Sequence, residues 1–162
     1  MGIDPSQFRH LIIRPALSIL NMPGVKAEAL LLGTAAQESA MGRYLHQLGG
    51  GPALGVFQME PATFRDIWRN YIHFQPDITR RLALHWPMEP EPEEMISDLM
   101  LAAVMCRLHY RRVLEPLPDH QDVGALAAYW KRYYNTPAGR GVESDFIQSW
   151  RRYVAWEHQE VK

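Results

Sequence analysis

The sequence predicts a single all-α domain, predominantly helical with little or no sheet. Apolar residues recur at three- and four-residue intervals along most of the chain, which is the spacing of a helix face that packs on a core. The alternation of apolar and polar residues that indicates strands is scarce. No internal repeat or linker divides the 162 residues, so we expect one domain over residues 1–162.

Capping and turn residues set the expected helix boundaries. Asp4 followed by Pro5 and Gln7 is typical of a helix start, and Pro15 should kink the helix that follows. Glycine- and proline-rich stretches predict loops at residues 21–24, 49–52 and 88–94. The helices expected between these signals cover residues 4–21, 25–41, 60–71, 76–86, 93–114, 121–134 and 144–157, and the helix over 93–114 should be the longest.

Composition narrows the classes of function. The formal net charge is −1, which gives no support for a nucleic-acid partner. No apolar run reaches membrane-spanning length, so we expect no stable membrane insertion. The first residues lack the basic and then apolar layout of a secretory signal, which predicts that the chain as written starts in the cytoplasm.

Metal and thiol chemistry find little support. The seven histidines are dispersed and show no His-Glu-x-x-His arrangement, so we expect no metal site. The single cysteine, Cys106, lies in an apolar helical run, and we interpret it as a small buried core residue. The alternative is a catalytic thiol that uses His109, one turn further along.

Glu38 is the candidate catalytic residue. It shares one face of the helix predicted over 25–41 with Ala27, Leu30, Leu31, Thr34 and Met41. A carboxyl group on such a face loses water, which raises its pKa and lets it act as a general acid near neutral pH. The alternative is a partly exposed glutamate near a helix end.

A second informative segment follows Glu38 in the chain. Residues 55–58, Gly-Val-Phe-Gln, precede Pro61-Ala62-Thr63 at an expected helix start. Gly55 permits close approach of the backbone to a ligand, and Gln58 offers an amide that both donates and accepts hydrogen bonds.

This ordered set resembles the soluble lytic transglycosylases of the lysozyme-like superfamily. Their pattern is a catalytic Glu-Ser at a helix end, then Gly-apolar-apolar-Gln, then Pro-x-Thr. The resemblance covers about residues 25–155. It includes a late Ala-Ala-Tyr segment that ends at Tyr129, but Trp130 stands where the family has Asn, and Asn70 and Asn135 are candidates to replace it.

The resemblance implies cleavage of the β-1,4 bond between N-acetylmuramic acid and N-acetylglucosamine in peptidoglycan. It implies that Glu38 acts first as acid and then as base, forms 1,6-anhydro ends, and needs no metal or organic cofactor. The residues expected to bind substrate are Ser39, Gly55, Phe57, Gln58 and Tyr129. For Ser39 the two interpretations are that it orients Glu38 through a hydrogen bond or that it merely ends the helix. For Phe57 and Tyr129 they are contact with a sugar face or packing in the core.

Two alternatives remain beside the transglycosylase. One is a muramidase that uses water as nucleophile, and the other is a non-catalytic glycan-binding or structural module of a phage particle. Ordinary glycosidases use two carboxylates. The next acids after Glu38 are Glu60, which suits a helix start, and Asp66, although Glu143 or Asp145 could fold back towards Glu38.

The absence of an export signal bears on delivery to the cell wall. We expect a virion-associated enzyme, a lysis enzyme released through a membrane pore, or a bacterial enzyme that a secretion machine carries; a shortened chain would look the same. Peptidoglycan strands, and a virion or a secretion machine, are the expected partners.

Overall fold

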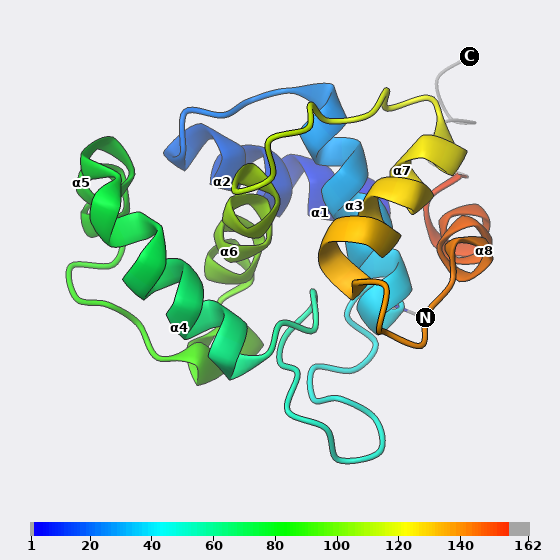
Figure 1. Cartoon of the computed structure of the whole chain (residues 1–162), viewed down its shortest axis with the longest axis horizontal. Helices are drawn as coiled ribbons and strands as arrows, with labels where there is room; N and C mark the ends of the chain where they lie inside the picture. Colours follow the sequence, from blue (N-terminus) through cyan, green and yellow to red (C-terminus); the bar gives the residue numbers. More distant parts are fainter. Residues whose placement is uncertain (1, 156–162) are drawn as a thin grey trace.

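The computed structural model describes residues 2–155, and over this range it confirms an all-α fold. The described residues contain no sheet, and pairing of strand type is limited to two isolated bridges, His46 with Leu54 and Leu54 with Met59. Figure 1 shows α3 near the middle of the molecule, with α4 and α5 to one side and α7 and α8 to the other. The long loop after α3 extends below these helices.

The first helical segment contains the irregularity that proline predicts. It consists of α1 (Pro5–Phe8), the π-helix η1 (Arg9–Ile13) and α2 (Arg14–Ile19). The Asp4 side chain caps its start by accepting a hydrogen bond of 2.9 Å from the Gln7 N–H. Pro15 has no N–H to donate to the preceding turn, and the backbone widens into the π-helix directly before it.

Helix α3 (Val25–Ser39) is the centre of the core. Its residues are buried on almost every side from Ala27 to Ala36, because α3 packs against α6, α7, α8 and η1. The helix ends at Ser39, two residues earlier than expected, and Ala40, Met41 and Gly42 all have positive φ angles. The chain therefore turns sharply just after Glu38.

The middle of the chain follows the prediction except in one place. Helices α4 (Pro61–Asn70) and α5 (Pro76–Ala83), joined by η2 (Ile72–Phe74), agree with the expected segments. The prediction of a single long helix over 93–114 was wrong. A short 3₁₀ helix η3 (Pro92–Ile96) precedes α6 (Leu99–Arg111), because the Asp98 side chain accepts the Leu101 N–H and starts a new helix. At 15 residues α3 is longer than α6, which has 13.

The C-terminal helices pack across α3. Helix α7 (Val123–Trp130) continues into a second π-helix, η4 (Lys131–Asn135), and α8 (Glu143–Tyr153) follows. Residues 156 and 157 of the last expected helix lie outside the described residues. Both α7 and α8 contact α3, so they bring residues from the end of the chain towards Glu38.

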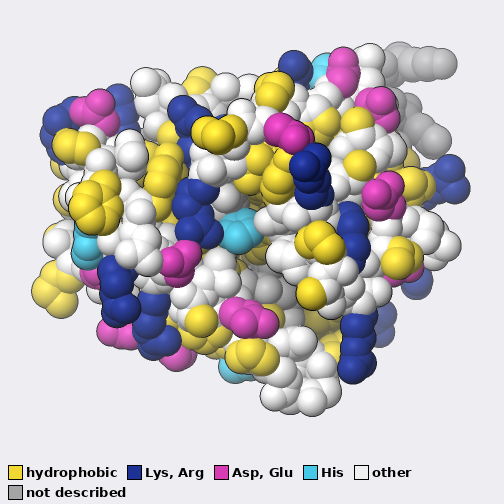
Figure 2. Space-filling view, viewed as in Figure 1, with side chains coloured by type: hydrophobic (Ala, Val, Ile, Leu, Met, Phe, Trp, Pro, Cys, Tyr) yellow, Lys and Arg dark blue, Asp and Glu magenta, His cyan; other side chains and the backbone are white. Residues whose placement is uncertain are grey.

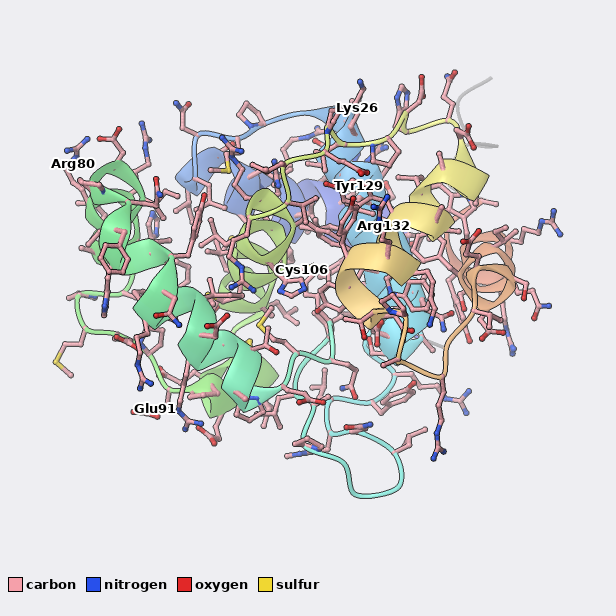
Figure 3. All side chains as sticks on the ribbon, in the orientation of Figure 1. Lys26, Arg80, Glu91, Cys106, Tyr129 and Arg132 are labelled. Carbon is pink, nitrogen blue, oxygen red and sulfur yellow. The ribbon has the colours of Figure 1, made fainter. Side chains whose placement is uncertain are left out.

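Cys106 lies on α6 in the interior of the molecule (Figure 3). It is fully buried, and burial raises the pKa of its thiol well above the usual value. The interpretation as a core residue is therefore confirmed. Within residues 2–155, no helix is both long and apolar enough to cross a membrane.

Candidate active site

A cavity of about 620 Å³ opens beside the C-terminal end of α3. Its walls come from loop 44–60, the first turn of α4, His109 of α6, and residues 134–141 after α7. Figure 2 shows a hollow at the centre of the face that carries these elements. The site thus combines segments that lie far apart in the sequence.

Glu38 lines this cavity and receives one strong hydrogen bond. The indole N–H of Trp130 donates to Glu38 Oε1 at 2.8 Å. Burial raises the pKa of Glu38 from its usual 4.5 to about 7, although the bond from Trp130 acts in the opposite direction by stabilising the carboxylate. Close to neutral pH, Glu38 can therefore either hold or release a proton, as the sequence predicts.

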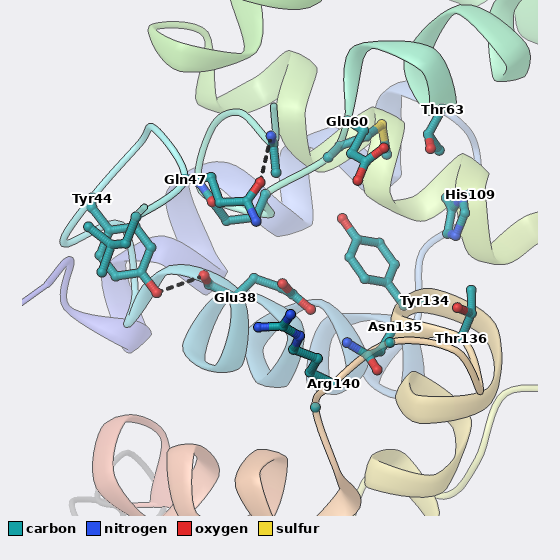
Figure 4. Close-up of a pocket in the computed structure, with 16 residues that line it drawn as sticks. Glu38, Tyr44, Gln47, Glu60, Thr63, His109, Tyr134, Asn135, Thr136 and Arg140 are labelled. Atoms are coloured by element: carbon teal, nitrogen blue, oxygen red, sulfur yellow. Dashed lines mark hydrogen bonds between the residues drawn. The ribbon is translucent and has the colours of Figure 1, made fainter. Parts of the chain in front are cut away.

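The backbone around Glu38 is held by the loop that follows it. The Tyr44 hydroxyl donates to the Glu38 carbonyl oxygen at 3.0 Å, and both residues line the cavity (Figure 4). The Ser39 hydroxyl donates to the Val56 carbonyl oxygen at 2.6 Å and accepts the Gly42 N–H at 2.8 Å. These bonds attach the end of α3 to the segment that contains Gly55 and Gln58.

The Gly-Val-Phe-Gln segment is a tight turn that requires glycine. Gly55 has φ +76°, and a Cβ atom there would lie 2.5 Å from the Met95 carbonyl oxygen. Gln58 also has a positive φ, +47°, and its side-chain amide donates to the Gly55 carbonyl oxygen at 2.9 Å. The turn leaves Gln58 at the cavity and directs Phe57 into the core.

The structure brings together only part of the predicted site. Glu38 and Gln58 line the cavity, whereas Ser39, Gly55 and Phe57 lie behind its wall. Ser39 is fully buried with its hydroxyl engaged, and Phe57 is 1% exposed and packs on Phe8. We therefore correct the expectation that these three residues contact substrate: they shape the wall instead.

Tyr129 also lies outside the cavity. Its hydroxyl donates to the Glu115 carbonyl oxygen at 3.0 Å, in a separate small cavity that includes Arg107. Besides Tyr44, the tyrosine that lines the cavity with Glu38 is Tyr134, whose hydroxyl donates to the Phe57 carbonyl oxygen at 2.6 Å. The assignment of Tyr129 is thus corrected in favour of a residue from the π-helix η4.

The residues that sequence reasoning placed least well are the neighbours of Glu38. Trp130 marks the departure from the family pattern, and it is this residue that contacts the acid. Asn135 lines the cavity and accepts a hydrogen bond from Lys131, whereas Asn70 bonds to Asp66 elsewhere. The replacement of the family Asn by Trp130 was the one sign in the sequence that this position is unusual, but it did not predict that Trp130 would be hydrogen-bonded to Glu38.

Charged groups at the cavity are few. Among residues 2–155, Glu60 is the other carboxylate in its wall, and Figure 4 shows it across the cavity from Glu38. Glu60 is exposed, and its side chain does not cap the helix α4 that it precedes. Arg140 reaches the cavity and forms no ion pair with any residue that the structure describes. Glu143 and Asp145 lie at the start of α8 and do not line the cavity.

His109 forms part of a partly buried hydrogen-bond chain in the opposite wall. Its Nε2–H donates to the Tyr133 carbonyl oxygen at 3.0 Å, so Nδ1 accepts from Arg112, which in turn pairs with Asp66. Burial and the Arg112 charge lower the pKa of His109 from 6.5 to about 4. His109 is therefore neutral at pH 7, and it connects α4, α6 and η4.

No family model, curated protein or solved structure matches this chain. Among residues 2–155, no group of three His, Cys, Asp or Glu side chains is placed to hold a metal ion.

Proposed function

We propose that this protein is a peptidoglycan lytic transglycosylase that cleaves the β-1,4 bond between N-acetylmuramic acid and N-acetylglucosamine. The observation that carries the proposal is Glu38 itself: a carboxyl group with a pKa of about 7, facing an open cavity large enough for sugar rings. The resemblance of the Glu-Ser, Gly-Val-Phe-Gln and Pro-Ala-Thr segments to that family supports the same assignment.

In the proposed reaction, protonated Glu38 gives its proton to the glycosidic oxygen as the bond to C1 of the muramic acid breaks. The Glu38 carboxylate then takes the proton of the muramic acid C6 hydroxyl, whose oxygen attacks C1 and closes the 1,6-anhydro ring. No water is consumed, and Glu38 ends protonated as it began. Trp130 would stabilise the carboxylate between the two steps through its N–H.

A second candidate, hydrolysis, is favoured by one observation. Glu60 lines the same cavity across from Glu38, exposed and without a capping bond to α4. Two carboxylates on opposite sides of a scissile bond are the arrangement of ordinary glycosidases. In that reaction Glu60 would activate a water, and the product would carry a reducing end. The third alternative, a glycan-binding phage module, would use the same cavity without chemistry.

The test is digestion of purified peptidoglycan, with mass spectrometry of the released muropeptides. The wild type should release products with 1,6-anhydro ends, one water lighter than hydrolytic products. Glu38→Gln should release almost none, and Glu60→Gln should retain activity. Reducing ends that disappear in Glu60→Gln would establish the hydrolase instead. No release by the wild type would favour the binding module, and full activity of Glu38→Gln would refute the assignment of the acid.

Such an enzyme acts outside the cytoplasmic membrane. We propose delivery with a phage particle, through a lysis pore, or by a bacterial secretion machine. Immunodetection of the protein in purified virions would identify the first route, and its absence from them would exclude that route.

A further inference from the structure

A second hollow, of about 490 Å³, lies at the N-terminal end of α3. It is lined by residues 22–27, by Arg107 of α6 and by Leu117. Figure 3 shows Lys26 at the outer end of α3, whereas Glu38 lies in the last turn of the same helix. At a rise of 1.5 Å per residue the two sites are about 20 Å apart, so this hollow is separate from the proposed active site.

Arg107 is the unusual feature of this hollow. Its side chain is largely buried, with 8% of the residue exposed, and its Nε and Nη1 atoms have no hydrogen-bond partner within the described structure. Burial, and then the charge of Arg111, lower the pKa of Arg107, and no carboxylate forms an ion pair with it among the described residues. Glu115, which lines a smaller cavity together with Arg107, pairs with Arg132 at 3.1 Å. A buried guanidinium charge with no acceptor beside it is unfavourable, and an oxyanion bound in the adjoining hollow would stabilise that charge.

The adjoining end of α3 has the same electrostatic character. The N-cap residue of α3 is Gly24, which has no side chain to accept the first N–H groups of the helix, and this end carries the positive pole of the helix dipole. Lys26 adds a second positive side chain. The one acid in the first turn, Glu28, is already paired, with Arg14 at 2.8 Å and with Arg9 at 3.9 Å.

The rest of the hollow is apolar. Its other side chains are those of Met22, Pro23, Val25, Ala27 and Leu117. A small inorganic ion would leave this surface uncovered, whereas an organic anion would cover it and pair with Arg107. We propose that the N-terminal end of α3 is a binding site for an organic carboxylate, with the acidic group between Arg107 and the α3 amides and the apolar body on Met22, Val25 and Leu117.

The test is a titration of the full chain followed by ¹H–¹⁵N NMR, at constant ionic strength, with hexanoate, acetate, inorganic phosphate and hexanol as probes. Hexanoate should shift the amide signals of Val25, Lys26 and Ala27 saturably. Acetate and phosphate should bind about tenfold more weakly, and hexanol should cause no saturable shift. Absence of saturation by hexanoate overturns the proposal. Tighter binding of inorganic phosphate overturns the carboxylate assignment and indicates a site for a phosphate group.

Variants assign the response to the proposed residues. Arg107→Met should weaken hexanoate binding at least about tenfold, because the charged hydrogen bonds are lost. Lys26→Gln, at an exposed position, should weaken it about threefold. Arg69→Gln, which removes an exposed arginine from α4, is the matched control and should leave binding unchanged. Hexanoate binding of Arg107→Met at wild-type strength would contradict the proposal. The melting temperature of Arg107→Met should not fall, because an unpartnered buried charge is removed.

Discussion

The indole N–H of Trp130 donates a hydrogen bond of 2.8 Å to Glu38 Oε1, and this bond joins the end of α7 to the end of α3. Trp130 is 1% exposed and packs against Phe146 of α8 at a ring-centroid distance of 5.6 Å. The acid is therefore positioned by a rigid aromatic ring that the core holds in place. The ring acts on the pKa of Glu38 in two opposite ways. Its body excludes water and so helps to raise the pKa, whereas its N–H stabilises the carboxylate and so limits the rise.

The first prediction concerns the pH dependence of peptidoglycan cleavage. The general acid must be protonated when substrate binds, so kcat/KM should fall as pH rises through about 7, the pKa of Glu38. In the proposed transglycosylase reaction Glu38 is also the later base, so no second carboxylate has to be ionised. We expect no acidic limb that depends on Glu60, measured as initial rates of solubilisation between about pH 4.5 and 9. An acidic limb that is lost in Glu60→Gln would contradict this expectation.

The second prediction is that Trp130→Phe moves this pH profile. Loss of the N–H removes the interaction that favours the carboxylate, so the pKa of Glu38 should rise and the basic limb should shift upward by about one pH unit. The smaller ring should also lower the free energy of unfolding by about 1–3 kcal/mol.

Trp68→Phe is the control for this variant. Trp68 is also buried, at 5% exposure, but its ring N–H has no partner among the described residues and does not reach Glu38. It should lower stability without moving the pH profile. An equal shift in both variants would show that the effect reflects general loosening of the core.

The third prediction tests the turn at Gly55. Gly55→Ala should lower the free energy of unfolding by about 3 kcal/mol or more, because a methyl group would meet the Met95 carbonyl oxygen at 2.5 Å in a backbone with positive φ. Gly49 has φ +82°, but a methyl group there would meet nothing within 4 Å, so Gly49→Ala should cost only about 1 kcal/mol. Urea unfolding of both variants provides the comparison. Equal losses would mean that Met95 moves aside.

The sequence predicted correctly those features that depend on interactions between residues close together in the chain. The Asp4 cap, the irregularity before Pro15 and the burial of the α3 face all depend on residues within a few positions of one another. The position of Glu38 near the end of a buried helix belongs to the same class. The split between η3 and α6 was missed because the apolar periodicity continues across Asp98, whose side chain starts a new helix.

The partners of Glu38 depend on packing between distant segments. Trp130 lies 92 positions further along the chain, and no periodicity connects the two residues. In a regular α-helix Tyr129 and Tyr133 lie on the same face, and their ring centroids are 4.8 Å apart. Neither residue lines the cavity. The π-helix η4 changes the register, so Tyr134 reaches the cavity instead. The sequence does not mark this wider turn with a proline or glycine.

The fourth prediction uses the opposite pKa shifts of Glu38 and His109. The pKa of Glu38 is raised from 4.5 to about 7, so the folded state retains a proton that the unfolded state releases, and stability falls as pH rises through that window. The pKa of His109 is lowered from 6.5 to about 4, so the unfolded state binds the proton first, and stability rises with pH up to about 6.5. Each contribution amounts to about 3 kcal/mol, and the two oppose each other between pH 4.5 and 6.5.

Single substitutions should separate these two contributions. Relative to the wild type, Glu38→Gln should gain stability as pH rises from 4.5 to about 7, by up to about 3 kcal/mol, because its amide still accepts the Trp130 N–H and carries no charge. As pH falls from 6.5 to about 4, the wild type loses stability because its unfolded state binds a proton at His109 that the folded state does not. His109→Gln has no such group, so its stability relative to the wild type should rise over the same range. Urea unfolding at half-unit pH intervals measures both differences. If the Glu38→Gln difference did not change with pH, the carboxyl group would have an ordinary pKa and the basis for its role as the acid would be lost.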